Sequence, residues 1–158
     1  MSTAPARARK WLGSTSNRTF IVWPAALFAI EALVQGGLPR IHWWALPLLA
    51  WGYLQYRLVG NYRNREGGGG PGQKVPPERI LDVGPYRFVR NPMYLGHLIF
   101  LAGLALLLGS WIGAAVLAGH AFWFQHHVRR DEERLAALFG DTYRDYCRRV
   151  KRWIPGIL

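Results

Sequence analysis

The stretch Gly84-Pro-Tyr-Arg-Phe-Val-Arg-Asn-Pro-Met-Tyr-Leu-Gly96 leads directly into the longest apolar run of the chain. Two prolines and two glycines shape its backbone, and two arginines and two tyrosines decorate it. Because the residue before a proline avoids the α region, we expect Gly84 and Asn91 to be extended. Pro92 suits the first position of a helix, and Asn91 is then its N-cap. The stretch therefore predicts a helix that begins at Pro92 with free backbone N–H groups and polar side chains around its start.

The apolar run that follows, residues 93–128, is too long for one ordinary membrane pass, and Gly109-Ser110 lies near its middle. A split at this point gives two short helices of about 27 Å each, joined by a tight turn. Two more apolar segments, 20–38 and 41–59, each reach nearly 30 Å, roughly the thickness of the hydrocarbon core. The chain thus has room for four passes, of which the last two form a tight hairpin.

The positions of the lysine and arginine residues predict how many times the chain crosses the membrane. Four lie within residues 1–19, seven between Arg57 and Arg90, and eight between Arg129 and Arg152, while Arg40 is the one exception. Cytoplasmic loops collect lysine and arginine, so the three basic segments should share one side of the membrane. This requires an even number of passes between them, and it places both termini in the cytoplasm.

The predicted fold is therefore an all-α integral membrane protein with four transmembrane helices and C-terminal cytosolic amphipathic helices. We expect a multi-pass protein of a bacterial or archaeal inner or plasma membrane. The tail should fold back on the membrane surface in two helices that meet at Gly140. The chain is predicted to be a single membrane domain, residues 1–158. Its segments are a cytosolic tail (1–19), the first two transmembrane helices (20–60), a cytosolic loop with the motif (61–92), the transmembrane hairpin (93–128) and a cytosolic helical tail (129–158). The cytosolic loop includes the glycines 67–70.

Composition excludes several other classes of protein. The formal charge is +11, yet 51% of residues are hydrophobic and 14% aromatic, which favours contact with membrane lipids over nucleic acid. The single cysteine, Cys147, excludes an internal disulfide and a cysteine-rich metal site. Its cationic neighbours could lower its pKa, although an inert cysteine fits as well. His126 and His127 point apart on a helix, and no metal site is expected.

A second polar cluster, Arg129-Arg-Asp-Glu-Glu133, follows the hairpin. The hairpin brings this cluster back to the membrane face where the opening stretch lies. Its carboxylates could be solvated helix caps, or they could bind an ammonium or sulfonium group. Arg129 and Glu133 are four residues apart and share one helical face.

The stretch Gly84–Gly96, the pair Glu132-Glu133 and, further along the chain, Phe139-Gly140, Tyr143, Tyr146, Val150 and Pro155 form an ordered pattern. This pattern resembles the isoprenylcysteine carboxyl methyltransferase family, and the phospholipid N-methyltransferases share its general signature. The resemblance covers residues 75–155, about half of the chain. It implies S-adenosylmethionine at the cytosolic membrane face and a lipophilic acceptor, either a small molecule or a lipidated one, reached from the bilayer. The residues that carry it are Gly84-Pro-Tyr-Arg-x-Val-Arg-Asn-Pro-x-Tyr-Leu-Gly96, Glu132-Glu133, Phe139-Gly140, Tyr143, Tyr146, Val150 and Pro155.

The resemblance also implies which residues serve the site. Methyl transfer from a sulfonium mainly needs alignment and exclusion of water. A carboxylate acceptor needs an arginine beside it, whereas an amine or thiol must lose a proton, so Arg129 and Glu133 are the catalytic candidates. The family usually has Arg-His-Pro where this chain has Arg90-Asn91-Pro92; Asn91 cannot take up a proton, so its contact with the cofactor would be positional. The cofactor-binding candidates are Gly84, Tyr86, Arg90, Asn91, Pro92, Tyr94, Leu95, Gly96, Glu132 and Glu133.

Two other functions stay open at this point. Membrane sterol reductases, which use NADPH, have similar features in Arg130-Asp-Glu132 and Tyr146-Cys147, but they usually have many more passes. A non-enzymatic scaffold whose clusters bind anionic lipid is the third possibility. The residues do not decide the methyl acceptor, nor whether its accepting atom is oxygen, nitrogen or sulfur.

Overall fold

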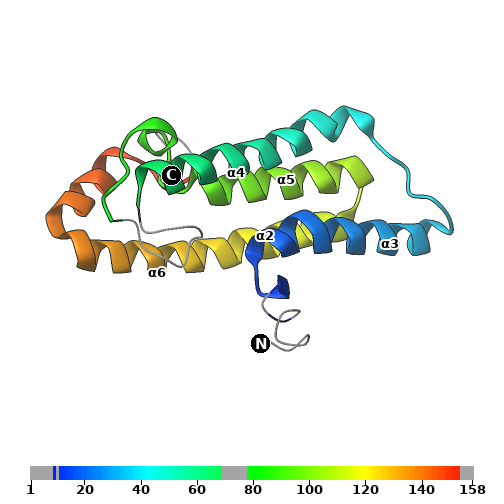
Figure 1. Cartoon of the computed structure of the whole chain (residues 1–158). Coiled ribbons are helices and arrows are strands. Elements are labelled where there is room, and N and C mark those ends of the chain that lie inside the picture. Colours follow the sequence, from blue (N-terminus) through cyan, green and yellow to red (C-terminus); the bar gives the residue numbers. More distant parts are fainter. Residues whose placement is uncertain (1–8, 10, 69–77, 154–158) are drawn as a thin grey trace, which may run out of the picture. The chain divides into compact units, whose positions relative to one another are not determined.

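The computed structural model describes residues 9, 11–68 and 78–153, and these form an all-α fold (Figure 1). One isolated parallel bridge, Val89 with Lys151, is the only extended pairing recorded in this part of the chain. Residues 1–8 and 10 of the predicted N-terminal tail, the glycines 69 and 70, and Pro155 lie outside the described residues. The elements in order are α2 (Thr15–Asn17), a π-helical turn (Arg18–Val22), α3 (Trp23–Gln35), a 3-10 turn (Trp43–Ala45), α4 (Leu46–Glu66), a 3-10 turn (Gly84–Arg87), α5 (Pro92–Leu108) and α6 (Trp111–Arg149).

The predicted hairpin is confirmed as a turn between α5 and α6. Gly109 has a φ of 59°, a left-handed conformation that favours glycine. Ser110 then caps α6, since its Oγ accepts a hydrogen bond from the backbone N–H of Gly113 at 2.8 Å. The helix start at Pro92 is also confirmed.

Three of the observed helices differ in their bounds from the predicted segments. The first helical segment runs from Thr15 to Gln35, where residues 20–38 were predicted. The second helix begins at Leu46 and continues to Glu66, so it takes in residues assigned to the cytosolic loop. The last hairpin helix does not end at residue 128, because α6 runs on without a break through the charged cluster to Gly140. Arginine and glutamate are good helix formers, so a change from apolar to charged residues does not by itself end a helix. Gly140, with φ 58° and ψ −133°, breaks the helical path where the prediction placed it.

Within the described residues, one helical segment has the length and apolar composition to cross a membrane. It runs from Thr15 to Gln35, near the N-terminus, through α2, the π-helical turn and α3. The segment α5 is as apolar as a membrane helix but has only 17 residues. The count of four passes therefore stays a prediction.

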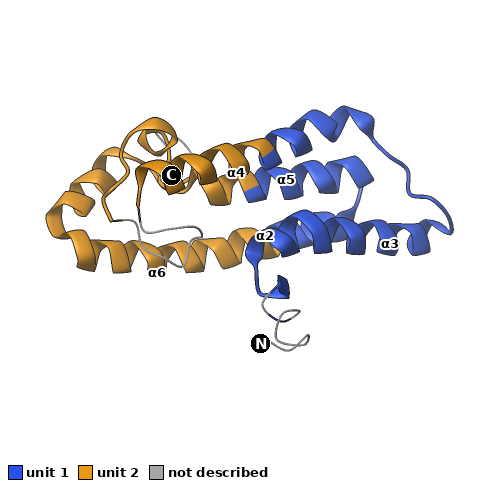
Figure 2. Ribbon diagram, in the orientation of Figure 1, with its two compact units in different colours: residues 1–53, 97–118 blue, residues 54–96, 119–158 orange. Residues whose placement is uncertain are grey.

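The chain divides into two compact units, each built from separate stretches of sequence (Figure 2). Unit 1 comprises residues 1–53 and 97–118. Its core contains Leu27 from α3 and Phe100, Leu104 and Leu108 from α5. Gly103 lets α5 approach α4 closely, since a Cβ at this position would lie 2.5 Å from the backbone nitrogen of Leu49.

We expect Gly103→Ala to lower the free energy of unfolding by about 1–3 kcal/mol, because the added methyl group meets backbone that cannot move aside. Gly119→Ala is the matched control: apart from the neighbouring residues and backbone of α6 itself, no atom of the described residues lies within 4 Å of its Cβ position, and alanine should stabilise that helix by about 1 kcal/mol. Denaturant titration in detergent measures both values. Equal stability of the two variants would contradict the close approach of α5 and α4.

Unit 2 comprises residues 54–96 and 119–158, and it contains the features on which function depends. Beyond Gly140, the last turns of α6 present Tyr143, Tyr146 and Val150 to a buried cluster. Ile80 from the segment before α5 and Phe139 from α6 pack against this cluster. The kink at Gly140 therefore allows the two parts of α6 in this unit to share one apolar core.

Candidate functional site

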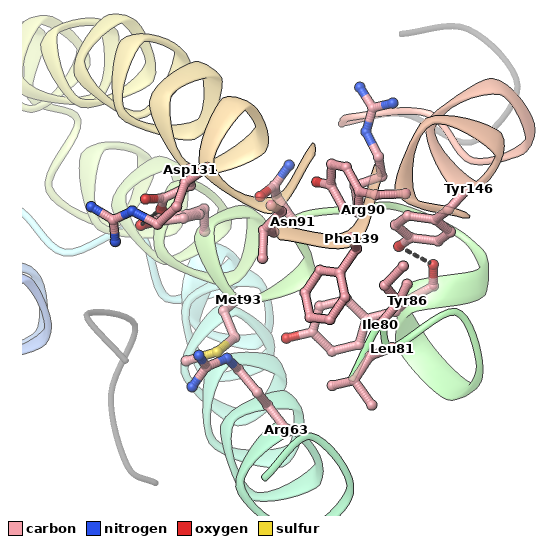
Figure 3. Close-up of a pocket in the computed structure, with 14 residues that line it drawn as sticks. Arg63, Ile80, Leu81, Tyr86, Arg90, Asn91, Met93, Asp131, Phe139 and Tyr146 are labelled. Carbon is pink, nitrogen blue, oxygen red and sulfur yellow. Dashed lines mark hydrogen bonds between the residues drawn. The ribbon is translucent and has the colours of Figure 1, made fainter. Parts of the chain in front are cut away.

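A pocket opens within unit 2 between three helices and the segment that precedes α5 (Figure 3). Its walls are mostly aromatic and aliphatic, with a few charged groups among them. Tyrosine supplies four of the rings. The lining residues are Arg63 from α4; Ile80, Leu81, Tyr86, Arg90 and Asn91 from the preceding segment; Met93 and Tyr94 from α5; and Asp131, Arg134, Leu135, Phe139, Tyr143 and Tyr146 from α6.

Gly84 sets the shape of the segment that enters the pocket. Its φ is +59°, so the expectation of an extended Gly84 was wrong. Glycine has no Cβ, and it can therefore take a positive φ before a proline where other residues cannot. A Cβ here would also lie 2.7 Å from Cζ of Tyr62. The tight 3-10 turn that results, Gly84–Arg87, carries Tyr86 to the pocket wall.

Asn91 is the polar group whose surroundings point most clearly to a ligand. It lines the pocket immediately before the start of α5. Its side-chain nitrogen Nδ2 is buried and has no hydrogen-bond partner among the described residues. A buried donor without a partner costs about 1–3 kcal/mol, so a ligand that accepts this hydrogen bond gains a corresponding advantage.

The tyrosines of the pocket are neutral side chains with no capacity to act as bases near neutral pH. Burial raises the pKa of Tyr86 to about 12, and burial also raises the pKa values of Tyr143 and Tyr146. The Tyr146 hydroxyl donates a hydrogen bond to the backbone oxygen of Tyr86 at 2.7 Å. This bond fixes the kinked end of α6 to the turn at Gly84.

Asp131 is the carboxylate that the structure places in the pocket wall. The hydroxyl of Tyr94 donates to its Oδ2 at 3.4 Å, and Nε2 of His127 lies 3.8 Å from the same oxygen. His127 in turn stacks on Trp123, with ring centroids 5.1 Å apart. Asp131 and His127 were not among the predicted site residues, because only the fold brings them to Tyr94.

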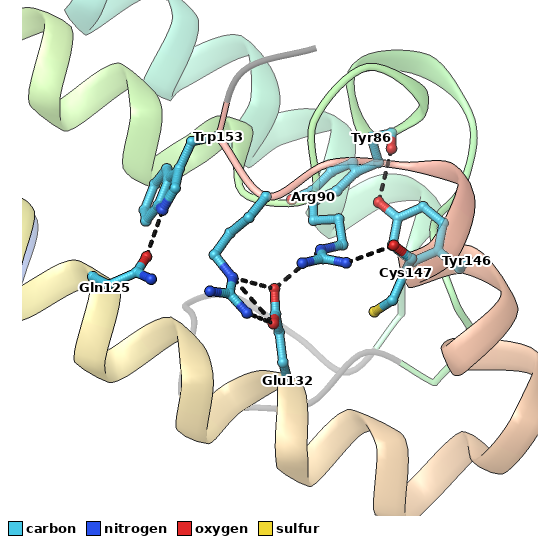
Figure 4. A network of polar contacts seen from close by, with 8 residues as sticks. Tyr86, Arg90, Gln125, Glu132, Tyr146, Cys147 and Trp153 are labelled. Carbon is cyan, nitrogen blue, oxygen red and sulfur yellow. Dashed lines mark hydrogen bonds and ion pairs between the residues drawn. The ribbon is translucent and has the colours of Figure 1, made fainter. Parts of the chain in front are cut away.

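Arg90 and Glu132, both predicted to bind the cofactor, form an ion pair with each other (Figure 4). Arg90 Nε lies 3.1 Å from Glu132 Oε1, and both side chains are mostly buried. Arg152 donates two hydrogen bonds to the same carboxylate, from Nε to Oε1 at 3.1 Å and from Nη2 to Oε2 at 2.6 Å. Arg90 also donates to the backbone oxygen of Cys147 at 2.9 Å. We call Arg90, Glu132 and Arg152 the clamp, since they fasten the end of the chain to the segment before α5.

A second, more open hollow contains the two predicted catalytic residues. Arg129 and Glu133 line it together with Glu132, and Tyr143 lines both hollows. Cys147 also lines it, and burial raises the pKa of its thiol, contrary to the lowering that its cationic neighbours suggested. A catalytic role for Arg129 and Glu133 stays a prediction.

The structure thus brings four of the predicted cofactor-binding residues to the pocket: Tyr86, Arg90, Asn91 and Tyr94. Gly84, Pro92, Leu95 and Gly96 are described but do not line it, so their contact with the cofactor stays a prediction. Arg63 was missed because α4 lies outside the motif that suggested the site. Phe139, Tyr143 and Tyr146 belonged to the recognised pattern, and their spacing around Gly140 was a usable signal.

Known proteins resemble this chain over the same region. The sequence pattern described as phospholipid methyltransferase matches residues 72–142. A protein-S-isoprenylcysteine O-methyltransferase of Schizosaccharomyces pombe is 34% identical over 78 residues, which are 48% of this chain and 33% of that protein. Methanethiol S-methyltransferase 1 of Bradyrhizobium diazoefficiens is 36% identical over 85 residues, which are 53% of this chain and 29% of that protein. The match therefore spans about a third of the length of these relatives.

A solved structure shares the fold over nearly the whole chain. It is that of a eukaryotic intramembrane Ras methyltransferase, an isoprenylcysteine carboxyl methyltransferase. The TM-score is 0.57 and the sequence identity 18%, and the match covers 99% of this chain and 55% of that one.

Proposed function

We propose that this chain methylates a lipophilic acceptor with S-adenosylmethionine, as a member of the family of membrane methyltransferases that includes the isoprenylcysteine and phospholipid methyltransferases. The proposal includes integration in a membrane by four passes, with both termini in the cytoplasm. The distribution of lysine and arginine supports that topology. The acceptor approaches from the bilayer at the cytosolic face.

The observation that carries the proposal is the buried Nδ2 of Asn91, which has no hydrogen-bond partner within the described part of the chain and lies in a pocket with mostly apolar walls. Small-molecule sites commonly combine such walls with a few placed polar groups. S-adenosylmethionine has a flat nucleoside, hydroxyl groups and a charged amino acid end, so it matches rings, amide donors and charged groups in one pocket. When bound, it supplies a methyl group on a positively charged sulfur.

The residues of the pocket hold the cofactor, orient it and shield it from water. Tyr86, Phe139 and Tyr146 form walls that exclude water, and Asn91 donates a hydrogen bond that fixes orientation. Neutral tyrosine rings also attract a cation to their faces, by about 0.5–2 kcal/mol. Since methyl transfer needs alignment more than proton transfer, an acceptor that is already ionised needs no catalytic base from the pocket.

The chemical class of the acceptor depends on which charged side chain of the pocket it contacts. An ionised carboxylate needs a cation, and the pocket offers Arg63; a thiol or amine needs a base, and the pocket offers Asp131. The names of the two relatives cover both kinds of acceptor, an isoprenylcysteine and methanethiol. Arg129 and Glu133, in the second hollow, are proposed as further groups for the acceptor's charge or proton.

The test is transfer of radiolabelled methyl groups from S-adenosylmethionine to membrane lipid extracts by the detergent-purified chain. We expect label in the organic phase that depends on the protein and is suppressed by S-adenosylhomocysteine. An isoprenylcysteine and methanethiol are added as defined acceptors in separate reactions. Absence of label with all acceptors, from protein shown to be folded, would argue for the scaffold reading.

Asn91→Leu is expected to weaken S-adenosylhomocysteine binding about tenfold, roughly 1.4 kcal/mol, because the amide donor is replaced by an apolar group. Calorimetry measures the dissociation constant. Asn91→His retains a donor and should restore most of the affinity. Asn64→Leu makes the same change on an exposed part of α4 and should leave the affinity as in the unaltered protein. A tenfold loss in the Asn64 variant would show that the effect is not specific to the pocket.

A further inference from the structure

A pair of side chains on α6 connects the exposed face of unit 2 with its pocket. His127 and Asp131 are four residues apart on this helix, so they lie one above the other on the same side. Asp131 lines the pocket (Figure 3), and Nε2 of His127 lies 3.8 Å from its Oδ2. The His127 side chain is 42% exposed. Two titratable groups therefore form a path from the pocket to the surface.

Aromatic rings fix the orientation of His127. Its imidazole stacks on Trp123 with an angle of 10° between the rings, and the ring of Tyr94 meets it edge-on with centroids 6.1 Å apart. The Tyr94 hydroxyl also donates a hydrogen bond to Oδ2 of Asp131. Residues of α5 and α6 thus hold the imidazole and the carboxylate toward each other. Separations of this size commonly shorten to hydrogen bonds when a ligand binds, and such a pair can then transfer a proton.

The charges of the pocket lining favour an acceptor that becomes negative when it loses a proton. Nearby cations ease the ionisation of a thiol and oppose the approach of an ammonium group. A thiol reacts as its thiolate, so its proton must be taken up before the methyl group is transferred. Among the described residues that line the pocket, only Asp131 has a carboxylate to accept this proton. The charged lining residues are Arg63, Arg90, Arg134 and Asp131.

We propose that Asp131 is the catalytic base for a thiol acceptor and that His127 carries the proton from Asp131 to solvent. This inference rests on the proposed function and narrows its acceptor to a thiol. The S–H bond breaks as the proton moves to the Asp131 carboxylate, and the acceptor sulfur keeps the electron pair. That pair forms the bond to the methyl carbon, and the bond between this carbon and the donor sulfur breaks. The products are a thioether, S-adenosylhomocysteine and one proton.

His127 is needed because a carboxylate is ordinarily a weaker base than a thiolate, so the proton does not remain on Asp131. An imidazole is the stronger base of the two, and transfer to it makes removal of the proton more favourable. Because its side chain is partly exposed, His127 can exchange this proton with water. His127 touches neither the acceptor nor the donor and acts through Asp131. It should therefore matter only for an acceptor that has a proton to lose.

The test compares two thiols that differ in their need for a base. 1-Butanethiol keeps its proton at neutral pH, whereas 4-nitrothiophenol is already ionised, and the visible absorbance of its thiolate reports its state when bound. We expect Asp131→Asn to slow methyl transfer to 1-butanethiol about 100-fold and transfer to 4-nitrothiophenol by less than about threefold. Calorimetry should show unchanged binding of S-adenosylhomocysteine, so the variant is folded. Asp141→Asn removes a carboxylate that is 85% exposed and should change neither rate.

His127→Gln should slow transfer to 1-butanethiol about tenfold and leave 4-nitrothiophenol unaffected. Imidazole added to the buffer should restore part of the lost rate, because the place of the partly exposed side chain is open to solvent. A merely structural contribution of His127 would not be replaced in this way. His126→Gln makes the same change at the adjacent exposed position and should leave both rates as in the unaltered protein.

The proposal is overturned if Asp131→Asn slows both thiols equally or slows neither. It is also overturned if the unaltered protein binds S-adenosylhomocysteine and methylates a carboxylate acceptor but neither thiol. A loss in His127→Gln that imidazole does not restore would remove His127 from the proton path. Failure of the proposed function looks different, because the unaltered protein would then bind no S-adenosylhomocysteine and methylate no acceptor of any class.

Discussion

Replacing Glu132 with alanine is expected to lower the free energy of unfolding by about 3–5 kcal/mol, the largest effect of any single substitution considered for unit 2. Glu132 lies between two arginines, and its side chain is only 13% exposed (Figure 4). Removal of the carboxylate leaves Arg90 and Arg152 facing each other without an anion. Like charges in a partly buried place repel, and their hydration is not restored by a small alanine side chain.

The measurement is denaturant unfolding in detergent, with Glu133→Ala as the matched control. Glu133 is the adjacent residue and is exposed, so its loss should change stability by no more than about 0.5 kcal/mol. The double variant Glu132→Ala with Arg152→Ala should regain part of the loss, since one of the two cations is gone. If Glu132→Ala and Glu133→Ala are equally stable, the clamp does not hold the end of the chain as described.

The same variants also separate structure from ligand binding. If Glu132 acts only through the clamp, the double variant that remains folded should bind S-adenosylhomocysteine with nearly unchanged affinity. A large loss of affinity in a stable double variant would return Glu132 to the cofactor-binding set that the motif suggested. This readout matters because Glu132 lines the second hollow rather than the pocket.

The second large expectation is a steep loss of stability at alkaline pH. The pKa of Tyr86 is raised from 10.0 to about 12, and burial also raises those of Tyr143 and Tyr146. Above pH 10 the unfolded chain loses these protons while the folded protein keeps them. The stabilisation from neutral burial is therefore fully present below about pH 10 and is lost as the pH rises towards 12 for Tyr86.

Each of the three tyrosines should contribute a slope of about 1.4 kcal/mol per pH unit in this window. Unfolding free energies measured at a series of pH values give the slope, and ultraviolet absorbance of phenolate reports the ionisation directly. Tyr146→Phe should reduce the slope by one tyrosine's share, although it also loses the hydrogen bond to the Tyr86 backbone. A stability that is flat between pH 10 and 12 would contradict the burial of these rings.

The helical content and the hairpin turn were predictable because they depend on local features. A glycine near the middle of an apolar run and a proline at its start act through backbone conformation, and no distant residue changes that. The continuation of α6 past Arg129 to Gly140 was not predictable from hydropathy. The change from apolar to charged residues at Arg129 reports a change of environment, and it says nothing about helix propensity.

The site was predictable only where the motif itself forms it. Tyr86, Asn91 and Tyr94 lie within thirteen consecutive residues, so a shared location was implied by proximity in sequence. Arg63 and Asp131 reach the pocket because α4 and α6 pack around the motif, and such packing depends on contacts between distant segments. Glu132 is a residue whose partners the sequence did not predict. Its charge suggested a contact with the ligand, yet in the structure it pairs with two arginines.

Calorimetric titration of the detergent-purified chain with S-adenosylhomocysteine decides whether this pocket binds the methyl donor, with NADPH as the parallel titrant. We expect saturable binding of S-adenosylhomocysteine, weakened about tenfold by Asn91→Leu, and no binding of NADPH. Folded protein that binds NADPH, or that binds S-adenosylhomocysteine with the same affinity in the Asn91→Leu variant, would contradict the assignment of this pocket to the methyl donor.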